Sequence, residues 1–218
     1  MACASAKDFA ACVSYALSCL KKEDLVLKPE QSAALEFIFQ GKDVFVWFPT
    51  GFGKSVCYQA LPFMFDHKLG RSTNRSVVLV VSPLVSLMVD QVKSLRAIGV
   101  GAAIMSIGHQ AGGQLARELL VAERDVEEGK LSLLFGAPEA IVGSERWRQL
   151  LLGDPLCQRI VAVADHCVYK WYTLFLLYCA FLYYIVHAYI IYYRNPKFRP
   201  SFGPLHELRT WFLLALQY

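Results

Sequence analysis

The feature that most constrains this chain is VFVWFPTGFGKS, residues 44–55, where an apolar run leads directly into a glycine-rich turn. The run from Val44 to Phe48 is short and continuously apolar, as strands buried on both faces are. The residues from Lys54 onward suit a helix that Pro62 bends or ends. We therefore expect a buried strand, a tight loop and a helix in immediate succession.

The glycines of this turn give it a chemical meaning. Gly51 and Gly53 let the backbone fold tightly so that its N–H groups point at phosphate oxygens, and the start of the helix adds a favourable dipole. Lys54 would reach the β and γ phosphates of a nucleotide, and the Ser55 hydroxyl would ligate Mg²⁺. The strict pattern has a further glycine where this chain has Phe48. We predict nucleoside triphosphate binding by Pro49, Thr50, Gly51, Phe52, Gly53, Lys54 and Ser55.

The rest of the chain alternates apolar runs with helical patterns. Such alternation through short connections is typical of a parallel sheet covered by helices on both faces. We therefore predict an α/β fold with a mainly parallel sheet flanked by helices, plus a long apolar helix near the C-terminus. Further strands are expected within 76–83, 100–107, 130–141 and 159–165, and helices within 1–24, 29–40, 84–99 and 114–130.

Composition sets only broad limits. The 218 residues are 56% hydrophobic, enough for a full core, and a net charge of +4 is too small to indicate a partner. The seven cysteines are scattered without a C-x-x-C pair, which favours reduced thiols in an intracellular protein. The first 24 residues lack the pattern of a secretory signal.

A second site element is expected at the end of the apolar run RIVAVAD. In phosphate-binding folds an aspartate at this place holds the metal through water, and a neighbouring glutamate polarises the attacking water. Asp165 fits the first role. His166 follows it directly, and no acidic residue fits the second role.

Six segments in order carry a resemblance to a known family. The chain resembles the first RecA-like domain of RecQ-type DNA helicases, within the DEAD/DEAH-type helicase core, over most of residues 25–210. The segments are LKPEQ, VFVWFPTGFGKSVCYQALP, VVLVVSPLVSLMVDQV, FGAPEAIV, DHCVYKW and FRPSFGPLHELR.

The resemblance implies roles for individual residues. Gln31, with Lys28 beside it, would read the adenine edge, since a side-chain amide both donates and accepts. Lys54, Asp165 and His166 would be the catalytic residues, and Ser55 and Asp165 would hold Mg²⁺. Contacts to DNA are implied for strand-tracking loops and an aromatic loop that stacks on single-stranded DNA, at Ser82, Pro83, Pro138, Glu139, Trp171, Phe198, Arg199 and Phe202.

The chain departs from the family at the metal strand. Where the family has Asp-Glu-Ala-His, this chain has Asp165 followed by His166, so the catalytic glutamate is absent. We expect ATP binding with crippled hydrolysis. The family motor also needs a second RecA-like domain, whereas the sequence given ends soon after LHELRTWFLL, so we expect an ATP-binding half that does not unwind DNA by itself.

A second departure is the apolar run 171–193, which has no formally charged residue when His187 is neutral and is long enough to cross a bilayer. Three interpretations stay open: a transmembrane helix with interfacial tyrosines and a basic flank, a buried helix, or a non-native segment such as translated intron sequence. We favour the non-native segment, because a deletion and an insertion so close together suggest a splice-site error.

These expectations divide the chain into a helical lead (1–24), the ATP-binding helicase domain (25–170), the apolar insertion (171–193) and the end of the domain (194–218). We expect a nuclear, RecQ-type 3′ to 5′ DNA helicase acting in DNA repair and recombination. Its ligands would be ATP, Mg²⁺ and single-stranded or forked DNA, with no other small-molecule substrate. A membrane-anchored nucleotide-binding protein is the main alternative, and a small-molecule kinase is disfavoured because LKPEQ and SPLVSLMVDQ have no function in it.

Overall fold

One six-stranded sheet organises the molecule. The computed structural model describes residues 6–49, 51–82, 84–105, 125–126, 128–137, 140–141, 144–153, 156–165 and 187–193. Within these ranges the strand order is β1-β6-β5-β2-β4-β3. The strands are β1 (Val44–Phe48), β2 (Val77–Val81), β3 (Ala102–Ile104), β4 (Leu133–Gly136), β5 (Ile160–Asp165) and β6 (His187–Tyr193).

The sheet is mostly parallel, as the sequence predicts. β5, β2, β4 and β3 are mutually parallel neighbours, while β6 runs antiparallel to both β1 and β5. Val81 is in register with Gly136 on one side and Asp165 on the other, so the carboxyl ends of β2, β4 and β5 lie at one edge of the sheet.

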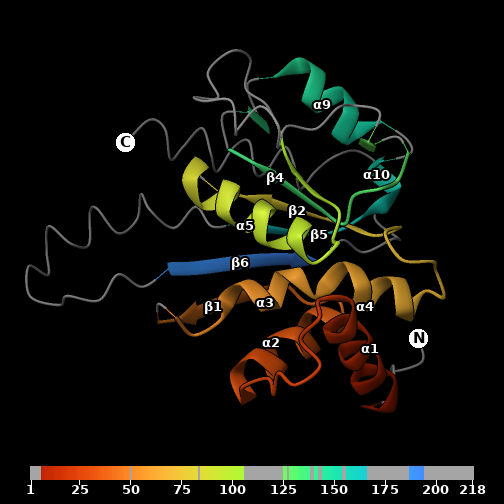
Figure 1. The fold of residues 1–218 in the computed structure, drawn as a ribbon, viewed down its shortest axis with the longest axis vertical. Helices are drawn as coiled ribbons and strands as arrows, with labels where there is room; N and C mark the ends of the chain where they lie inside the picture. The colour runs from red at the N-terminus through yellow and green to blue at the C-terminus, as the bar shows by residue number, and fades with distance from the viewer. Residues whose placement is uncertain are drawn as a thin grey trace, which may run out of the picture.

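Helices flank the sheet and cover its apolar residues. α4 packs against β2 and β5, α1 packs on α4, and α5 packs against β3. Figure 1 shows α1 and α2 at one end of the molecule, beyond α3 and α4, with α9 at the other end. The helices are α1 (Ala6–Cys19), α2 (Pro29–Phe39), α3 (Lys54–Gln59), α4 (Leu61–Lys68), α5 (Val85–Ala97), α9 (Glu145–Leu152) and α10 (Leu156–Arg159).

The core is centred on β2. All five residues from Val77 to Val81 are buried, at 2% exposure or less. A strand with neighbours on both sides and helices against it needs such a continuous apolar run, because neither face meets water. Tyr58, Phe63 and Phe135 are among the largest fully buried side chains around it.

The amino ends of three strands are joined by the guanidinium of Arg159, which precedes β5. Arg159 is 9% exposed and donates from Nε to the carbonyl of Arg75 (3.0 Å) and from Nη1 to that of Val126 (2.9 Å). Its Nη2 donates to the carbonyls of Asn74 (2.9 Å) and Leu131 (3.0 Å). Residues just before β2, β4 and β5 are therefore held by a single side chain.

Asp66 of α4 completes this amino-end cluster. Its fully buried carboxylate accepts hydrogen bonds from the backbone N–H groups of Ser76 (2.7 Å) and Arg75 (3.2 Å). Burial raises the pKa of the Asp66 carboxyl above its ordinary value. Asn74, which has a positive φ of 69°, accepts at Oδ1 from the Ser132 hydroxyl (2.7 Å). The loop before β2 is thus fixed to α4 and to the start of β4.

The structure corrects the prediction for the helix after the glycine loop. Pro62 neither bends nor ends a single helix: α3 ends at Gln59, and Pro62 lies in the first turn of α4. Proline is well tolerated there, because a first-turn N–H has no partner within the helix. The two helices meet at Ala60.

The apolar run 171–193 is the second correction. Residues 187–193 form strand β6, so the expectation of one long apolar helix is wrong over this part, because these residues complete hydrogen bonding between β1 and β5. Residues 171–186 lie outside the described ranges. Among the residues that the structure describes, no helix combines the length and apolarity that a membrane span requires.

Candidate nucleotide-binding site

The loop between β1 and α3 has the backbone shape that its glycines predict. Gly51 and Gly53 have φ values of 78° and 84°, a region that residues with a Cβ rarely adopt. The loop is closed by a hydrogen bond from the Phe52 N–H to the Pro49 carbonyl (3.2 Å). A Cβ added at Gly51 would meet no atom within 4 Å, so open space adjoins the loop. An anion has room to approach the backbone there.

Lys54 lies inside the curve of this loop. The residue is 8% exposed, and Nζ donates to the carbonyls of Phe48 and Pro49, both at 2.8 Å. Burial lowers the pKa of the Lys54 ammonium, because a charged group is disfavoured away from water. An anionic ligand would favour the charged form again. The position fits the predicted phosphate-binding role.

Gln31 and Lys28, predicted to read the adenine edge, contact the glycine loop. Gln31 is 4% exposed, and its Nε2 donates to the carbonyls of Phe52 (2.8 Å) and Gly53 (3.2 Å). Its Oε1 accepts from the Lys28 N–H at 2.9 Å, which caps the start of α2. The Lys28 ammonium lies 3.7 Å from the centroid of the Phe52 ring, and that ring packs on Phe48 at 4.7 Å. The start of α2 is thereby attached to the glycine loop.

The predicted metal ligands are located less completely. Ser55 is half-buried in the first turn of α3, next to Lys54. Asp165 ends β5, but the structure describes its backbone alone. The register through β6 aligns Asp165 with Phe45, since both pair with Ile190. Asp165 therefore lies three residues short of the end of β1, about 10 Å along the strand direction.

Ser82, predicted to contact DNA, follows the carboxyl end of β2. It is 3% exposed; its N–H donates to the Gly136 carbonyl (3.0 Å), and its hydroxyl accepts from the Leu84 N–H (3.4 Å). These bonds shape the turn into α5. Leu84 and Val85 beyond it are 40% and 46% exposed.

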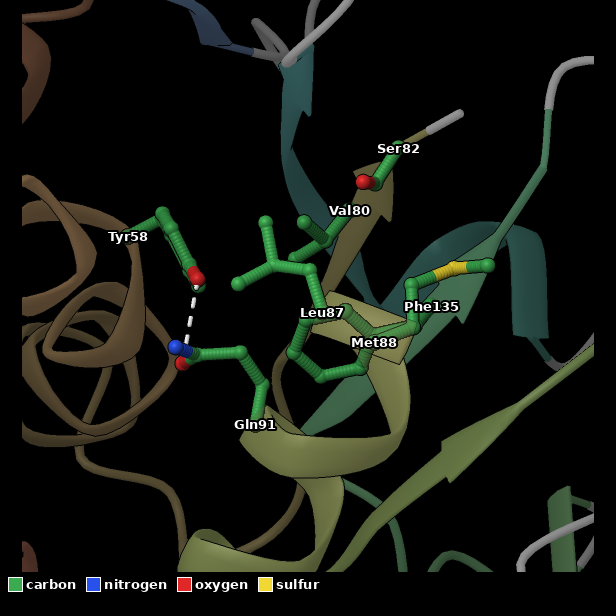
Figure 2. Close-up of a pocket in the computed structure, with 7 residues that line it drawn as sticks. All are labelled: Tyr58, Val80, Ser82, Leu87, Met88, Gln91 and Phe135. Atoms are coloured by element: carbon green, nitrogen blue, oxygen red, sulfur yellow. Dashed lines mark hydrogen bonds between the residues drawn. The ribbon is translucent and has the colours of Figure 1, made fainter. Parts of the chain in front are cut away.

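A polar network between α3 and α5 was not predicted from the sequence. Gln91 accepts at Oε1 from Gln59 Nε2 (2.7 Å) and from the Tyr58 hydroxyl (3.3 Å), and Lys22 donates to Gln59 Oε1 (3.5 Å). Figure 2 shows Tyr58 facing Gln91 beside Met88. The adjoining cavity of about 10 Å³ has space for about one water molecule and none for a nucleotide. The available signal was the presence of glutamines on otherwise apolar helix faces.

Several predicted site residues lie outside the described ranges, so their roles stay predictions. They are Thr50, Pro83, Pro138, Glu139, His166, Trp171, Phe198, Arg199 and Phe202.

The glycine loop, the buried lysine and the mostly parallel sheet agree with what sequence comparison finds. Residues 28–156 match the family model described as DEAD/DEAH box helicase. That is more than half of the chain, and the chain belongs to this family.

Individual relatives are RecQ-type helicases, which confirms the resemblance inferred from the motifs. ATP-dependent DNA helicase Q-like 4B of Arabidopsis thaliana is 35% identical over 66% of this chain and 12% of its own length. ATP-dependent helicase SGS1 of Saccharomyces cerevisiae is 37% identical over 66% of this chain and 10% of its own. ATP-dependent DNA helicase RecQ of Haemophilus influenzae is 30% identical over 65% of this chain and 20% of its own length. This chain thus spans about a tenth to a fifth of the length of these three relatives.

Proposed function

We propose that this chain is the ATP-binding RecA-like domain of a RecQ-type 3′ to 5′ DNA helicase, and that it binds Mg-ATP but hydrolyses it negligibly. The observation that carries the binding part is Lys54, buried within a loop that has two positive-φ glycines and adjoins open space at Gly51. The relatives' names identify them as ATP-dependent helicases, which supports ATP as the nucleotide.

Each group of the loop has a distinct role in this proposal. The backbone N–H groups bind the phosphate oxygens, and the Lys54 ammonium exchanges its two carbonyl partners for the β and γ phosphates. Ser55 is the proposed direct protein ligand of Mg²⁺ beside the loop, and Asp165 would hold the ion through water. When bound, Mg²⁺ would neutralise charge on the phosphates.

Negligible hydrolysis is proposed from the sequence at the end of β5. Asp165 is followed directly by His166, which leaves no carboxylate beside it to orient and deprotonate the attacking water. Loss of a general base typically removes about 10²- to 10⁴-fold in rate. Bound ATP would therefore persist.

DNA is the proposed macromolecular partner, because the names of the Arabidopsis thaliana and Haemophilus influenzae relatives specify a DNA helicase. Ser82 is the described part of the proposed contact surface. A nuclear location and a role in repair and recombination complete the proposal.

Calorimetric titration of Mg-ATP into the chain tests the binding part. Lys54→Ala should weaken binding about tenfold or more, because charge-assisted hydrogen bonds are lost. Lys93→Ala, which removes an exposed lysine of α5, is the matched control and should leave the affinity unchanged. Equal affinities for wild type and Lys54→Ala would refute the site.

Phosphate release with and without single-stranded DNA tests the hydrolysis part. We expect rates at background for wild type and for Lys54→Ala. DNA-stimulated hydrolysis that disappears in Lys54→Ala would show that the chain is a working ATPase, while leaving ATP binding intact as a conclusion.

A further inference from the structure

We propose that Gln91 is a positioning residue that links the nucleotide site to the turn after β2, so that phosphate binding at Lys54 stabilises the residues that follow Ser82. This inference rests on the proposed function and extends it from nucleotide binding to the transmission of that binding. The link has three parts: the short helix α3, the amide of Gln91 and the first turns of α5.

The first part is the spacing of side chains on α3. This helix has only six residues and begins at Lys54. Residues four apart lie on the same side of a helix, about 6 Å apart along its axis. Tyr58 therefore follows Lys54 on one side of α3, and Gln59 follows Ser55 beside it. Each of the two proposed ligand-binding side chains is thus one turn away from a side chain that bonds to α5.

The second part is the acceptor on α5. The Oε1 of Gln91 accepts from Gln59 Nε2 (2.7 Å) and from the Tyr58 hydroxyl (3.3 Å). Lys22, whose ammonium has donors alone, bonds to Gln59 Oε1 (3.5 Å) and so orients the amide with Nε2 toward Gln91. Gln59 and Tyr58 are 6% and 1% exposed. A displacement of α3 therefore acts on Gln91 through two bonds that are shielded from water.

The third part connects Gln91 to the turn after β2. Leu87 and Leu84 precede Gln91 by about one and two turns, and the Leu84 N–H donates to the Ser82 hydroxyl (3.4 Å). Ser82 and Leu87 also line the cavity of about 10 Å³ that Tyr58 and Gln91 line. Figure 2 shows these side chains around it. The proposed DNA contact at Ser82 and the bonds from α3 thus meet at the same part of α5.

Phosphate binding supplies the change that this link transmits. Lys54 bonds to the carbonyls of Phe48 and Pro49, and in the proposed complex it exchanges them for phosphate oxygens, so that the ligand holds the first turn of α3. A ligand shifts a neighbouring segment only by the difference in its affinity for two arrangements of that segment. The bonds to Gln91 make the position of α5 part of this difference. The first turns of α5 should therefore open less often when nucleotide is bound.

Hydrogen–deuterium exchange of the chain, measured by mass spectrometry with and without saturating Mg-ATP, tests the link. In wild type, Mg-ATP should slow the exchange of residues 84–90 about fivefold, a factor equivalent to the net contribution of about one hydrogen bond. Residues 145–152 of α9 are the internal reference and should change by less than about twofold. Gln91→Leu removes the acceptor and should reduce the slowing to that of the reference, while ATP affinity stays within about threefold of wild type.

Three further variants control for loss of stability alone. Gln91→Glu keeps an acceptor oxygen and should retain the slowing of residues 84–90, which a merely structural role does not predict. Gln40→Leu replaces an exposed glutamine at the end of α2 and should also retain it. Tyr58→Phe removes one hydroxyl and keeps the ring. It decides the test if Gln91→Leu does not fold, and it should reduce the slowing to about twofold.

The outcomes separate this inference from the proposed function. Full slowing of residues 84–90 in Gln91→Leu or, where that variant does not fold, in Tyr58→Phe would overturn the inference and leave nucleotide binding established. So would equal exchange with and without Mg-ATP in a wild-type chain that binds it by calorimetry. Absence of binding by wild type, or binding that Lys54→Ala leaves intact, would refute the proposed function and the inference with it.

Discussion

At the amino ends of β2, β4 and β5, four hydrogen bonds from Arg159 end on backbone carbonyls, whereas at the carboxyl end of β1 the glycine loop adjoins open space. Both regions bury a cationic side chain. Arg159 joins segments that precede three different strands, while the partners of Lys54 among the described residues are the carbonyls of Phe48 and Pro49, at the start of its own loop. The first cation stabilises the fold, and the second can exchange its partners for a ligand.

The largest effect is expected at the amino ends. Arg159→Met should lower the free energy of unfolding by about 3 kcal/mol or more, because buried carbonyls that lose their donors cost about 1–3 kcal/mol each. Urea denaturation monitored by circular dichroism measures the change. A loss below about 1 kcal/mol would contradict the assigned role, and ATP affinity of the folded variant should equal that of wild type.

The stabilising role of the cluster at the amino ends of the strands can also be tested by pH, through Asp66. Its pKa is raised by burial, so the folded state takes up the proton at a higher pH than the unfolded state. The stability that wild type has over Asp66→Ala should therefore grow as the pH falls from 7 through the folded-state pKa, and level off below the unfolded value. Urea titrations at several pH values measure this. A difference that shrinks on acidification would show that the carboxylate form is the favoured one.

Substitutions in the glycine loop should lower nucleotide affinity more strongly than they lower the free energy of unfolding. Gly53→Ala places a Cβ at positive φ and 2.7 Å from Gln31 Nε2. We therefore expect the free energy of unfolding to fall by about 1–3 kcal/mol and the Gln31 amide to be displaced. Gly51→Ala, where the Cβ meets open space, should cost only the backbone strain, about 1 kcal/mol. Equal nucleotide affinity of the two variants would refute the importance of the contact between Gln31 and Gly53.

The two regions also differ in what the sequence reveals. Strands β1, β2, β4 and β5 follow continuous apolar runs, and the shape of the glycine loop follows from its glycines, because these are local signals. The Arg159 cluster joins residues 66, 74 and 159, which no local pattern connects. The contacts of Gln31 with Phe52 and Gly53 likewise could not be predicted from the sequence, since they depend on how α2 packs beside the loop. The sequence predicts residues 187–193 to be part of a long apolar helix, because an apolar run does not show which strands it will pair with.

Strand β6 has a consequence for how the nucleotide site is assembled. Among the described strands, β1 bonds to β6 alone, and Val44 pairs with Ile191 across most of the chain length. Closing so long a loop comes before any gain from pairing, which makes the contact slow to form. During synthesis, β1, which leads into the phosphate loop, could join the sheet only after residues 187–193 have been made. Any splice form that ends before His187 would leave that strand without its hydrogen-bonding partner.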